Sequence, residues 1–254
     1  MTGWEPLLLA MIGGALVGFL LTLFGGGGSV LATPWLIYVV GLVDTHAAIG
    51  TSAAAVAVNA ATGLAAQARA GKVKWPCASV FAVSGLAGAL LGAQLARRVD
   101  GEALLMWFAV AMIAIAVSML VPRKSEGDPS VHLKPAMVLK LAPVGLLAGL
   151  AAGFFGIGGG FLIAPGLMAS TGMALANASA SSLLSVTLFG TATSASYAVA
   201  GKVVWPLFGA LVAGGAAGTL AAMPISKRLA GRGQVTRTLF ALMVIAVGVW
   251  ILAR

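Results

Sequence analysis

Two glycine-rich stretches, one in each half of the chain, decide how this sequence is expected to fold. They read Phe24-Gly25-Gly26-Gly27-Gly28-Ser29 and Phe155-Gly156-Ile157-Gly158-Gly159-Gly160. In both, a proline (Pro34 or Pro165) lies ten residues after the phenylalanine, and the two copies are 131 residues apart. Because each glycine costs a helix roughly 1 kcal/mol relative to alanine, both stretches are expected to break a helix.

Two further matches keep nearly the same register between the halves. Gly71-Lys72-Val73-Lys74-Trp75-Pro76 matches Gly201-Lys202-Val203-Val204-Trp205-Pro206, and Arg97-Arg98 matches Lys227-Arg228, both at a spacing of 130 residues. Three anchors in one register predict a tandem duplication. The predicted organisation is a membrane repeat over residues 1–121, a polar linker over 122–138, and a second membrane repeat over 139–254.

The composition places these repeats in a lipid bilayer. Of the 254 residues, 60% are apolar and only 8% are charged, whereas soluble domains contain about 25% charged residues. Residues 6–43 and 141–201 contain no charged side chain, and about 20 apolar residues suffice for a transmembrane helix. We therefore predict an all-α polytopic membrane protein, because runs such as Ala103–Val121 lack the alternation of a transmembrane β-barrel.

Each repeat is predicted to contain a helix that ends at the glycine break, a short segment with a proline, and three long helices. The predicted ranges are 7–24, 29–43, 46–69, 76–97 and 102–121, then 141–155, 161–173, 177–200, 206–227 and 237–253. The short segments either cross the bilayer or are re-entrant. Crossing divides the Lys and Arg residues eleven to four between the two faces, and re-entry divides them nine to six. Since cytoplasmic loops are enriched in these residues, we favour crossing, which makes the repeats inverted.

The positive charge of the chain fits the same interpretation. The net charge is +9, but the Lys and Arg residues lie in short loops between apolar runs. Such residues orient helices and contact anionic lipid headgroups, so we expect the lipid bilayer as a partner and no nucleic acid. Cys77 is the only cysteine of the sequence, which excludes an intrachain disulfide.

The glycine clusters are the first candidate for a binding site. Broken helices at corresponding positions of two repeats are the best sequence indication of a transporter site. The candidate residues are Gly25, Gly26, Gly27, Gly28 and Ser29 in the first copy, and Gly158, Gly159 and Gly160 in the second. The alternative, close helix packing, fits the helical glycines better, so alanine at Gly88 is expected to change little.

Hydroxyl groups after each short segment are the second candidate. Thr51 and Ser52 lie near the start of one predicted helix, and Ser181 and Ser182 lie at the corresponding place in the other repeat. Free N–H groups and the positive end of the helix dipole attract anions there, and hydroxyls add hydrogen-bond donors. The alternative, ordinary capping or hydrogen bonding within the helix, stays open.

The acidic residues indicate which substrates to exclude. All six lie at predicted helix ends or in loops: Glu5, Asp44, Asp100, Glu102, Glu126 and Asp128. Cation pumps and metal carriers place ionisable groups inside the membrane, and His46, His132 and Cys77 are too scattered to form a metal site. We therefore expect no metal and no cofactor, and a small anionic substrate. No enzyme is expected, because neither histidine lies within a span and no phosphate-binding loop is present.

The glycine cluster leading to Pro34, the Gly50-Thr51-Ser52 sequence and the Gly-Lys-x-x-Trp-Pro turn resemble the sulfite exporter TauE/SafE family. The resemblance covers nearly the whole chain. It implies a secondary transporter, usually an exporter, of sulfite, sulfonates or related sulfur-containing anions across the bacterial inner membrane. Ala180-Ser181-Ser182 replaces Gly-Thr-Ser in the second half, and Ile157 interrupts the second glycine run. These departures leave open a carrier for another small anion or solute, or an anion channel, and the sequence fits a homodimer or a monomer.

Overall fold

A computed structural model of the chain describes residues 4–120, 127–128, 131–156, 160–229 and 233–253. This part consists of α-helices and one 3-10 helix, without any β-strand. The elements are α1 (Glu5–Phe24), η1 (Gly25–Leu31), α2 (Ala32–Tyr38), α3 (Thr45–Arg69), α4 (Trp75–Ala96), α5 (Gly101–Leu120), α6 (Pro135–Phe155), α7 (Gly160–Thr171), α8 (Leu175–Val199), α9 (Trp205–Leu229) and α10 (Gly233–Leu252).

The predicted all-α membrane class is confirmed. Six helices of the described part are long and apolar enough to cross a membrane: α1, α3, α4, α5, α6 and α9. The helix α8 is as long as α3 but is rich in serine and threonine, which lowers its hydropathy. It packs against α3, α4 and α7, and the hydroxyl groups of Ser181, Ser182, Ser185 and Thr193 are buried there.

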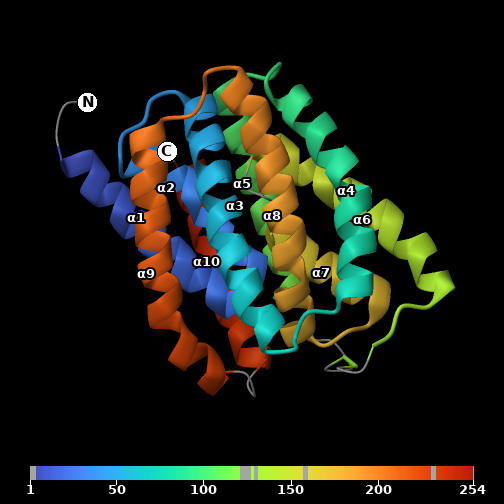
Figure 1. The fold of residues 1–254 in the computed structure, drawn as a ribbon. Coiled ribbons are helices and arrows are strands. Elements are labelled where there is room, and N and C mark those ends of the chain that lie inside the picture. The colour runs from blue at the N-terminus through green and yellow to red at the C-terminus, as the bar shows by residue number, and fades with distance from the viewer. Residues whose placement is uncertain (1–3, 121–126, 129–130, 157–159, 230–232, 254) are drawn as a thin grey trace.

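The path of the chain places both of its ends on one side of the molecule (Figure 1). We call this side the terminal end; it also carries residues 39–44, 97–100 and 200–204, since Asp44 contacts Lys202 and Thr45 contacts Gly101. The opposite side is the linker end; there the Asn177 side chain bonds to the Lys72 carbonyl, and Asp128 bonds to Gly172. The segments η1–α2 and α7 therefore both run from one end to the other, as the crossing alternative predicts.

The two halves are joined by helices that touch at glycine. The helix α1 packs along α9, and α4 packs along α6. A Cβ atom at Gly18 would overlap the Gly215 carbonyl, and a Cβ atom at Gly149 would overlap the Gly85 carbonyl. Gly18 and Gly149 are 131 residues apart, and Gly85 and Gly215 are 130 apart. The two contacts therefore correspond at the spacing of the sequence repeat, which favours a pseudo-symmetric pair of halves.

The packing role expected for the helical glycines is confirmed, but the tolerance expected at Gly88 is wrong. A Cβ atom on Gly88 would overlap the carbonyl oxygen of Leu146 in α6. A backbone atom held in a helix cannot rotate aside as a side chain can. Alanine at this position must therefore push α4 and α6 apart.

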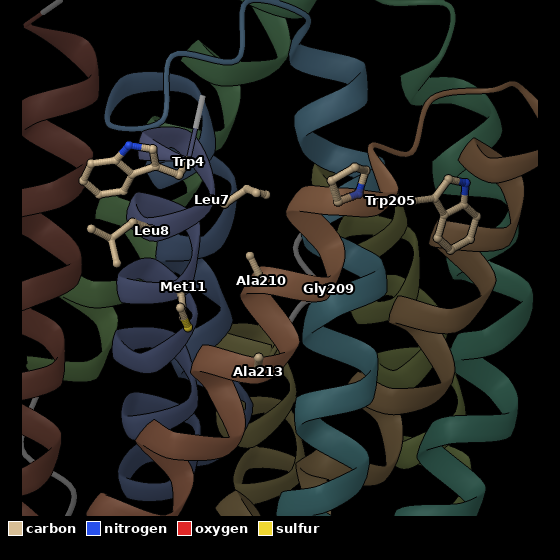
Figure 2. A pocket seen from close by; sticks show the side chains of 9 residues that line it. Trp4, Leu7, Leu8, Met11, Trp205, Gly209, Ala210 and Ala213 are labelled. Atoms are coloured by element: carbon tan, nitrogen blue, oxygen red, sulfur yellow. The ribbon is translucent and has the colours of Figure 1, made fainter. Parts of the chain in front are cut away.

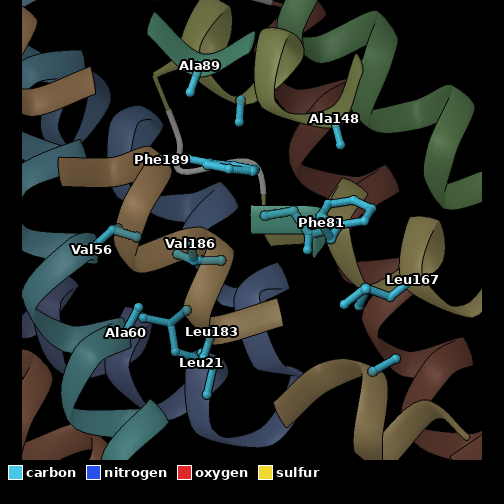
Figure 3. Packing of buried hydrophobic residues seen from close by; sticks show 14 of the residues in the cluster. Leu21, Val56, Ala60, Phe81, Ala89, Ala148, Leu167, Leu183, Val186 and Phe189 are labelled. Carbon is cyan, nitrogen blue, oxygen red and sulfur yellow. The ribbon is translucent and has the colours of Figure 1, made fainter. Parts of the chain in front are cut away.

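The largest apolar core lies where α3, α4, α6, α7 and α8 meet (Figure 3). Phe81 of α4 and Phe189 of α8 are fully buried at its centre, and Val56 of α3 packs beside them. A second cluster joins α5 and α10 through Phe108 and Phe240 and includes Val30 of η1. The glycine-rich η1 thus lies between the two cores and contacts α7 of the other half.

Candidate functional site

The start of α3 holds Ser52 in a buried hydrogen-bond network. Asp44 caps the helix by accepting a hydrogen bond from the Ala47 amide at 3.1 Å. The Ser52 hydroxyl donates to the Ile49 carbonyl at 3.1 Å and lies 2.7 Å from the hydroxyl of Thr33 in α2. Ser52 and Thr33 are both buried. The short segment is therefore fixed to the long helix by a hydroxyl pair.

Thr51 and Ser181 make the same contact in opposite halves. The Thr51 hydroxyl accepts a hydrogen bond from the Val204 amide at 2.9 Å, and the Ser181 hydroxyl accepts one from the Lys74 amide at 2.9 Å. These amides lie at the starts of α9 and α4, where helices leave N–H groups unpaired. A hydroxyl that accepts a hydrogen bond still carries its own proton. Both side chains therefore keep one donor.

The start of α8 resembles the start of α3 but lacks its acidic cap. Ala174 occupies the capping position, where its own side chain makes no capping hydrogen bond. The Ser182 hydroxyl donates to the Ser179 carbonyl at 2.8 Å, as Ser52 does to Ile49. The Asn177 side chain donates to the Lys72 carbonyl at 2.9 Å, which links α8 to the first half.

Each glycine break packs against the first turn of a long helix from the other half. Gly25 ends α1 with a φ of 67° and lies against Ser179 of α8. Gly156 ends α6 with a φ of 67° and lies against Ile49 of α3. Positive φ angles favour glycine, and a side chain at either position would overlap the facing helix. The breaks therefore bring the starts of α3 and α8 into contact with both halves.

The rest of the predicted glycine site is closely packed where the structure describes it. A Cβ atom at Gly27 would overlap the Phe240 ring, and one at Gly28 would overlap the backbone of Leu20 and Leu21. Gly26 and the buried Ser29 lie in the same 3-10 helix. Gly160 begins α7, and Gly158 and Gly159 lie outside the described residues. Ligand binding by this set stays a prediction.

The buried polar groups of the described residues are uncharged. They comprise Asn59 and the hydroxyl groups of Ser29, Thr33, Thr51, Ser52, Ser170, Thr171, Ser181, Ser182, Ser185, Thr193, Tyr197 and Thr219. Within the described part of the chain, no three His, Cys, Asp or Glu side chains lie close enough to hold a metal ion. Such an environment provides neutral hydroxyl and amide groups, which can donate hydrogen bonds to an anion without a buried counter-charge.

Charged side chains meet at the terminal end instead. The Lys202 ammonium lies 2.6 Å from the Asp44 carboxylate, and the two side chains are 44% and 41% exposed. Partial burial raises the pKa of Asp44, but the hydrogen bond from Lys202, the amide of Ala47 and the lysine charge outweigh it. The pKa of Asp44 therefore lies below its usual range, and the carboxylate stays ionised at neutral pH.

An apolar groove of about 550 Å³ opens between α1 and α9, apart from these polar groups (Figure 2). It begins at the terminal end, where Trp4 and Trp205 are largely exposed. Tryptophan is enriched at membrane–water interfaces. The groove is lined by Trp4, Leu7, Leu8, Met11, Trp205, Pro206, Gly209, Ala210 and Ala213. With no hydrogen-bonding side chain except the indole groups, it does not suit an anion.

Removing the Ser181 hydroxyl is expected to destabilise the protein. Ser181→Ala leaves the Lys74 amide without its acceptor, and an unpaired buried group costs about 1–3 kcal/mol. Thermal unfolding of the purified protein measures the change. Ser194→Ala is the matched control, because that hydroxyl bonds only within its own helix, to Thr191. Equal melting temperatures for the two variants would contradict the anchoring role.

Sequence reasoning missed three residues of this region. Thr33 directly precedes Pro34, but Ala164 occupies its place before Pro165, so the repeat gave no signal for it. His46 and Tyr197 stack with ring centroids 6.0 Å apart, although they are distant in sequence. Nothing in the local sequence pairs these two rings, and only the antiparallel packing of α3 and α8 brings them together.

Comparison with known proteins agrees with this architecture. The sequence model of the family described as sulfite exporter TauE/SafE matches residues 10–251. The chain belongs to this family. No solved structure shows a significant similarity to the chain. As a TauE/SafE protein with several apolar helices of membrane-spanning length, it is a multi-pass membrane transporter.

Similar proteins carry the same general description. A probable membrane transporter protein of Xylella fastidiosa is 42% identical over 251 residues, which cover 98% of this chain and 96% of the relative. A protein of that description from Haemophilus influenzae is 29% identical over 77% of this chain and 75% of its own length. The probable membrane transporter protein YunE of Bacillus subtilis is 25% identical over 82% of this chain and 84% of its own length.

Proposed function

We propose that this TauE/SafE protein is a secondary transporter that exports small sulfur-containing anions, such as sulfite or an organosulfonate, across the bacterial inner membrane. The description of the family as sulfite exporter supports the substrate class and the direction. The uncharged, hydroxyl-rich interior supports an anion, because hydroxyl and amide donors hold oxyanions without a buried counter-charge.

The observation that carries the proposal is the matched geometry of Thr51 and Ser181. Each hydroxyl is buried near the start of a long helix and accepts a hydrogen bond from a backbone amide of the other half. Its own proton remains available as a donor. The positive ends of α3 and α8 add a favourable field for an anion. Ser52 and Ser182 are weaker candidates, since each already donates to a carbonyl of its own helix.

Alternating access follows from movement of one half against the other. In this proposal the glycine breaks at Gly25–Gly28 and Gly158–Gly160 offer backbone N–H groups to the anion. Pro34 and Pro165 fix the bend of the short segments that cross the bilayer. The linker end faces the cytoplasm, which agrees with the positive-inside rule, because it carries Arg69, Lys72, Lys74, Lys134 and Lys140.

A flux assay in proteoliposomes tests the proposal. We expect saturable transport of sulfite or an organosulfonate, weaker transport of sulfate, and no transport of divalent metals. Measurements with and without a proton gradient identify the coupling. Stabilisation by micromolar nickel or cobalt, with no response to any of these anions, would show that the substrate class is wrong. If only an unrelated small solute were transported, the protein would still be a secondary transporter, but sulfur-containing anions would not be its substrates.

A further inference from the structure

Two contacts between the halves lie side by side at the terminal end. The first is the ion pair between Asp44, which precedes α3, and Lys202, which follows α8, at 2.6 Å. The second is the stack of His46 on Tyr197, with an interplanar angle of 25°. Gly50 of α3 packs closely between them, since a Cβ atom there would overlap the Lys202 carbonyl and the Tyr197 side chain. The start of α3 is thus held against the end of α8.

At the linker end, the described residues that occupy the corresponding positions of the repeat are of other types, except for one lysine. At the spacing of the repeat, Asp44 and His46 correspond to Ala174 and Ala176, and Tyr197 and Lys202 correspond to Gln67 and Lys72. Two alanines can form neither an ion pair nor a ring stack. The described contacts between α8 and the loop before α4 are neutral hydrogen bonds, from Asn177 to the Lys72 carbonyl and from the Lys74 amide to Ser181. Asp44, His46 and Tyr197 therefore have no counterpart of the same residue type at the corresponding positions of the other half.

The stacked rings also carry unpaired polar atoms. Tyr197 is fully buried, and neither its hydroxyl nor the Nδ1 atom of His46 has a hydrogen-bond partner among the described residues. Unpaired buried groups are unfavourable relative to hydrated ones. Separating α3 from α8 would hydrate both groups, which offsets part of the contact energy that is lost. The free-energy difference between the closed and the separated arrangement of α3 and α8 is thereby reduced, as a contact that opens and closes requires.

We propose that Asp44, His46, Tyr197 and Lys202 form a gate that closes the terminal end. The gate rests on the proposed function, because it acts on a carrier that alternates between two states. The ion pair stabilises the state that is closed at the terminal end. Breaking the ion pair is therefore expected to shift the equilibrium towards the state that is open at the terminal end.

Cysteine labelling tests the gate without requiring transport. Ile49 is buried behind the gate and belongs to the same apolar cluster as Tyr197. Ile49→Cys is introduced in a Cys77→Ala background, and its labelling by a membrane-impermeant thiol reagent is measured in nanodiscs. Asp44→Asn keeps a capping side chain but removes the charge, and Lys202→Met removes the partner. Each is expected to raise the labelling rate about twofold to fivefold, because an ion pair exposed to solvent contributes little free energy.

The double variant and salt separate the ion pair from general damage. Asp44→Asn with Lys202→Met is expected to label no faster than the faster single variant, because both remove one interaction. A roughly tenfold rise in salt should speed labelling of the parent protein by screening the pair and leave the double variant unchanged. Arg98→Met, at an exposed cation of the same end, should have no effect.

Unchanged labelling in both single variants, or additive effects in the double variant, would overturn the gate. These outcomes are distinct from failure of the proposed substrate. Normal sulfite flux together with unchanged labelling would support the proposed function and contradict the proposed gate. The expected labelling pattern without any sulfur-anion flux would retain the gate and remove the substrate.

Discussion

Alanine in place of Gly25 is expected to abolish transport and to destabilise the protein. The backbone of Gly25 has φ 67° and ψ −147°, a conformation close to one that only glycine occupies readily. The strain alone is expected to cost about 1–3 kcal/mol. In addition, the new methyl group would overlap the backbone of Ser179 at the start of α8. Flux in proteoliposomes and thermal unfolding of the purified protein measure the two effects.

Gly41 provides the matched control for this substitution. It also has a positive φ, of 80°, but a Cβ atom there would meet nothing within 4 Å. Gly41→Ala therefore isolates the backbone strain from the contact with α8, and it should reduce stability while leaving transport measurable. If Gly25→Ala transported as well as Gly41→Ala, the contact between the first glycine break and α8 would have no role in the transport cycle.

Alanine in place of Gly149 is expected to separate α4 from α6. Replacing a helical glycine by alanine ordinarily stabilises a helix by about 1 kcal/mol. At Gly149, however, the added carbon would overlap the Gly85 carbonyl, and overpacking typically costs about 1–3 kcal/mol. The net effect is therefore expected to be a lower melting temperature.

Gly209 in α9 is the control for Gly149, since a Cβ atom there has open space around it. Gly209→Ala should keep the gain in helix stability and raise the melting temperature slightly. The pair of variants thus predicts effects of opposite sign from the same chemical change. A rise in both melting temperatures would mean that α4 and α6 do not approach as closely as described.

The sequence was sufficient to predict the helices because membrane helices depend mainly on local composition. The third helix begins at Thr45 instead of the predicted residue 46, where the Asp44 side chain caps it. The break after Phe24 was predictable because a glycine-rich stretch, followed by a proline at the same spacing, recurs in the second half. Charge asymmetry favoured short segments that cross the bilayer, and η1–α2 and α7 run between the two ends of the described structure. Their crossing of a bilayer stays a prediction.

The contacts between the halves could not be predicted from the sequence. Thr51 was expected near a helix start, but nothing in the sequence identifies the Val204 amide as its partner. The sequence also could not separate glycines with unusual φ angles from glycines that allow close approach. Gly25 does both, whereas Gly28 mainly fits against α1. Both distinctions depend on which helix lies opposite, and that is set by how the helices of the chain pack against one another.

The pairing of α1 with α9 and of α4 with α6 bears on how the protein is made. The first half leaves the ribosome before α6 and α9 exist, so the glycine faces of α1 and α4 have no protein partner when they first enter the bilayer. Lipid must cover these faces until the second half is inserted and displaces it. Larger proteins commonly fold domain by domain. The first half of this chain, in contrast, cannot complete its packing before the second half is inserted. Residues 1–121 expressed alone would expose the glycine faces of α1 and α4 to lipid. A compact protein is expected only when residues 139–254 are co-expressed with them.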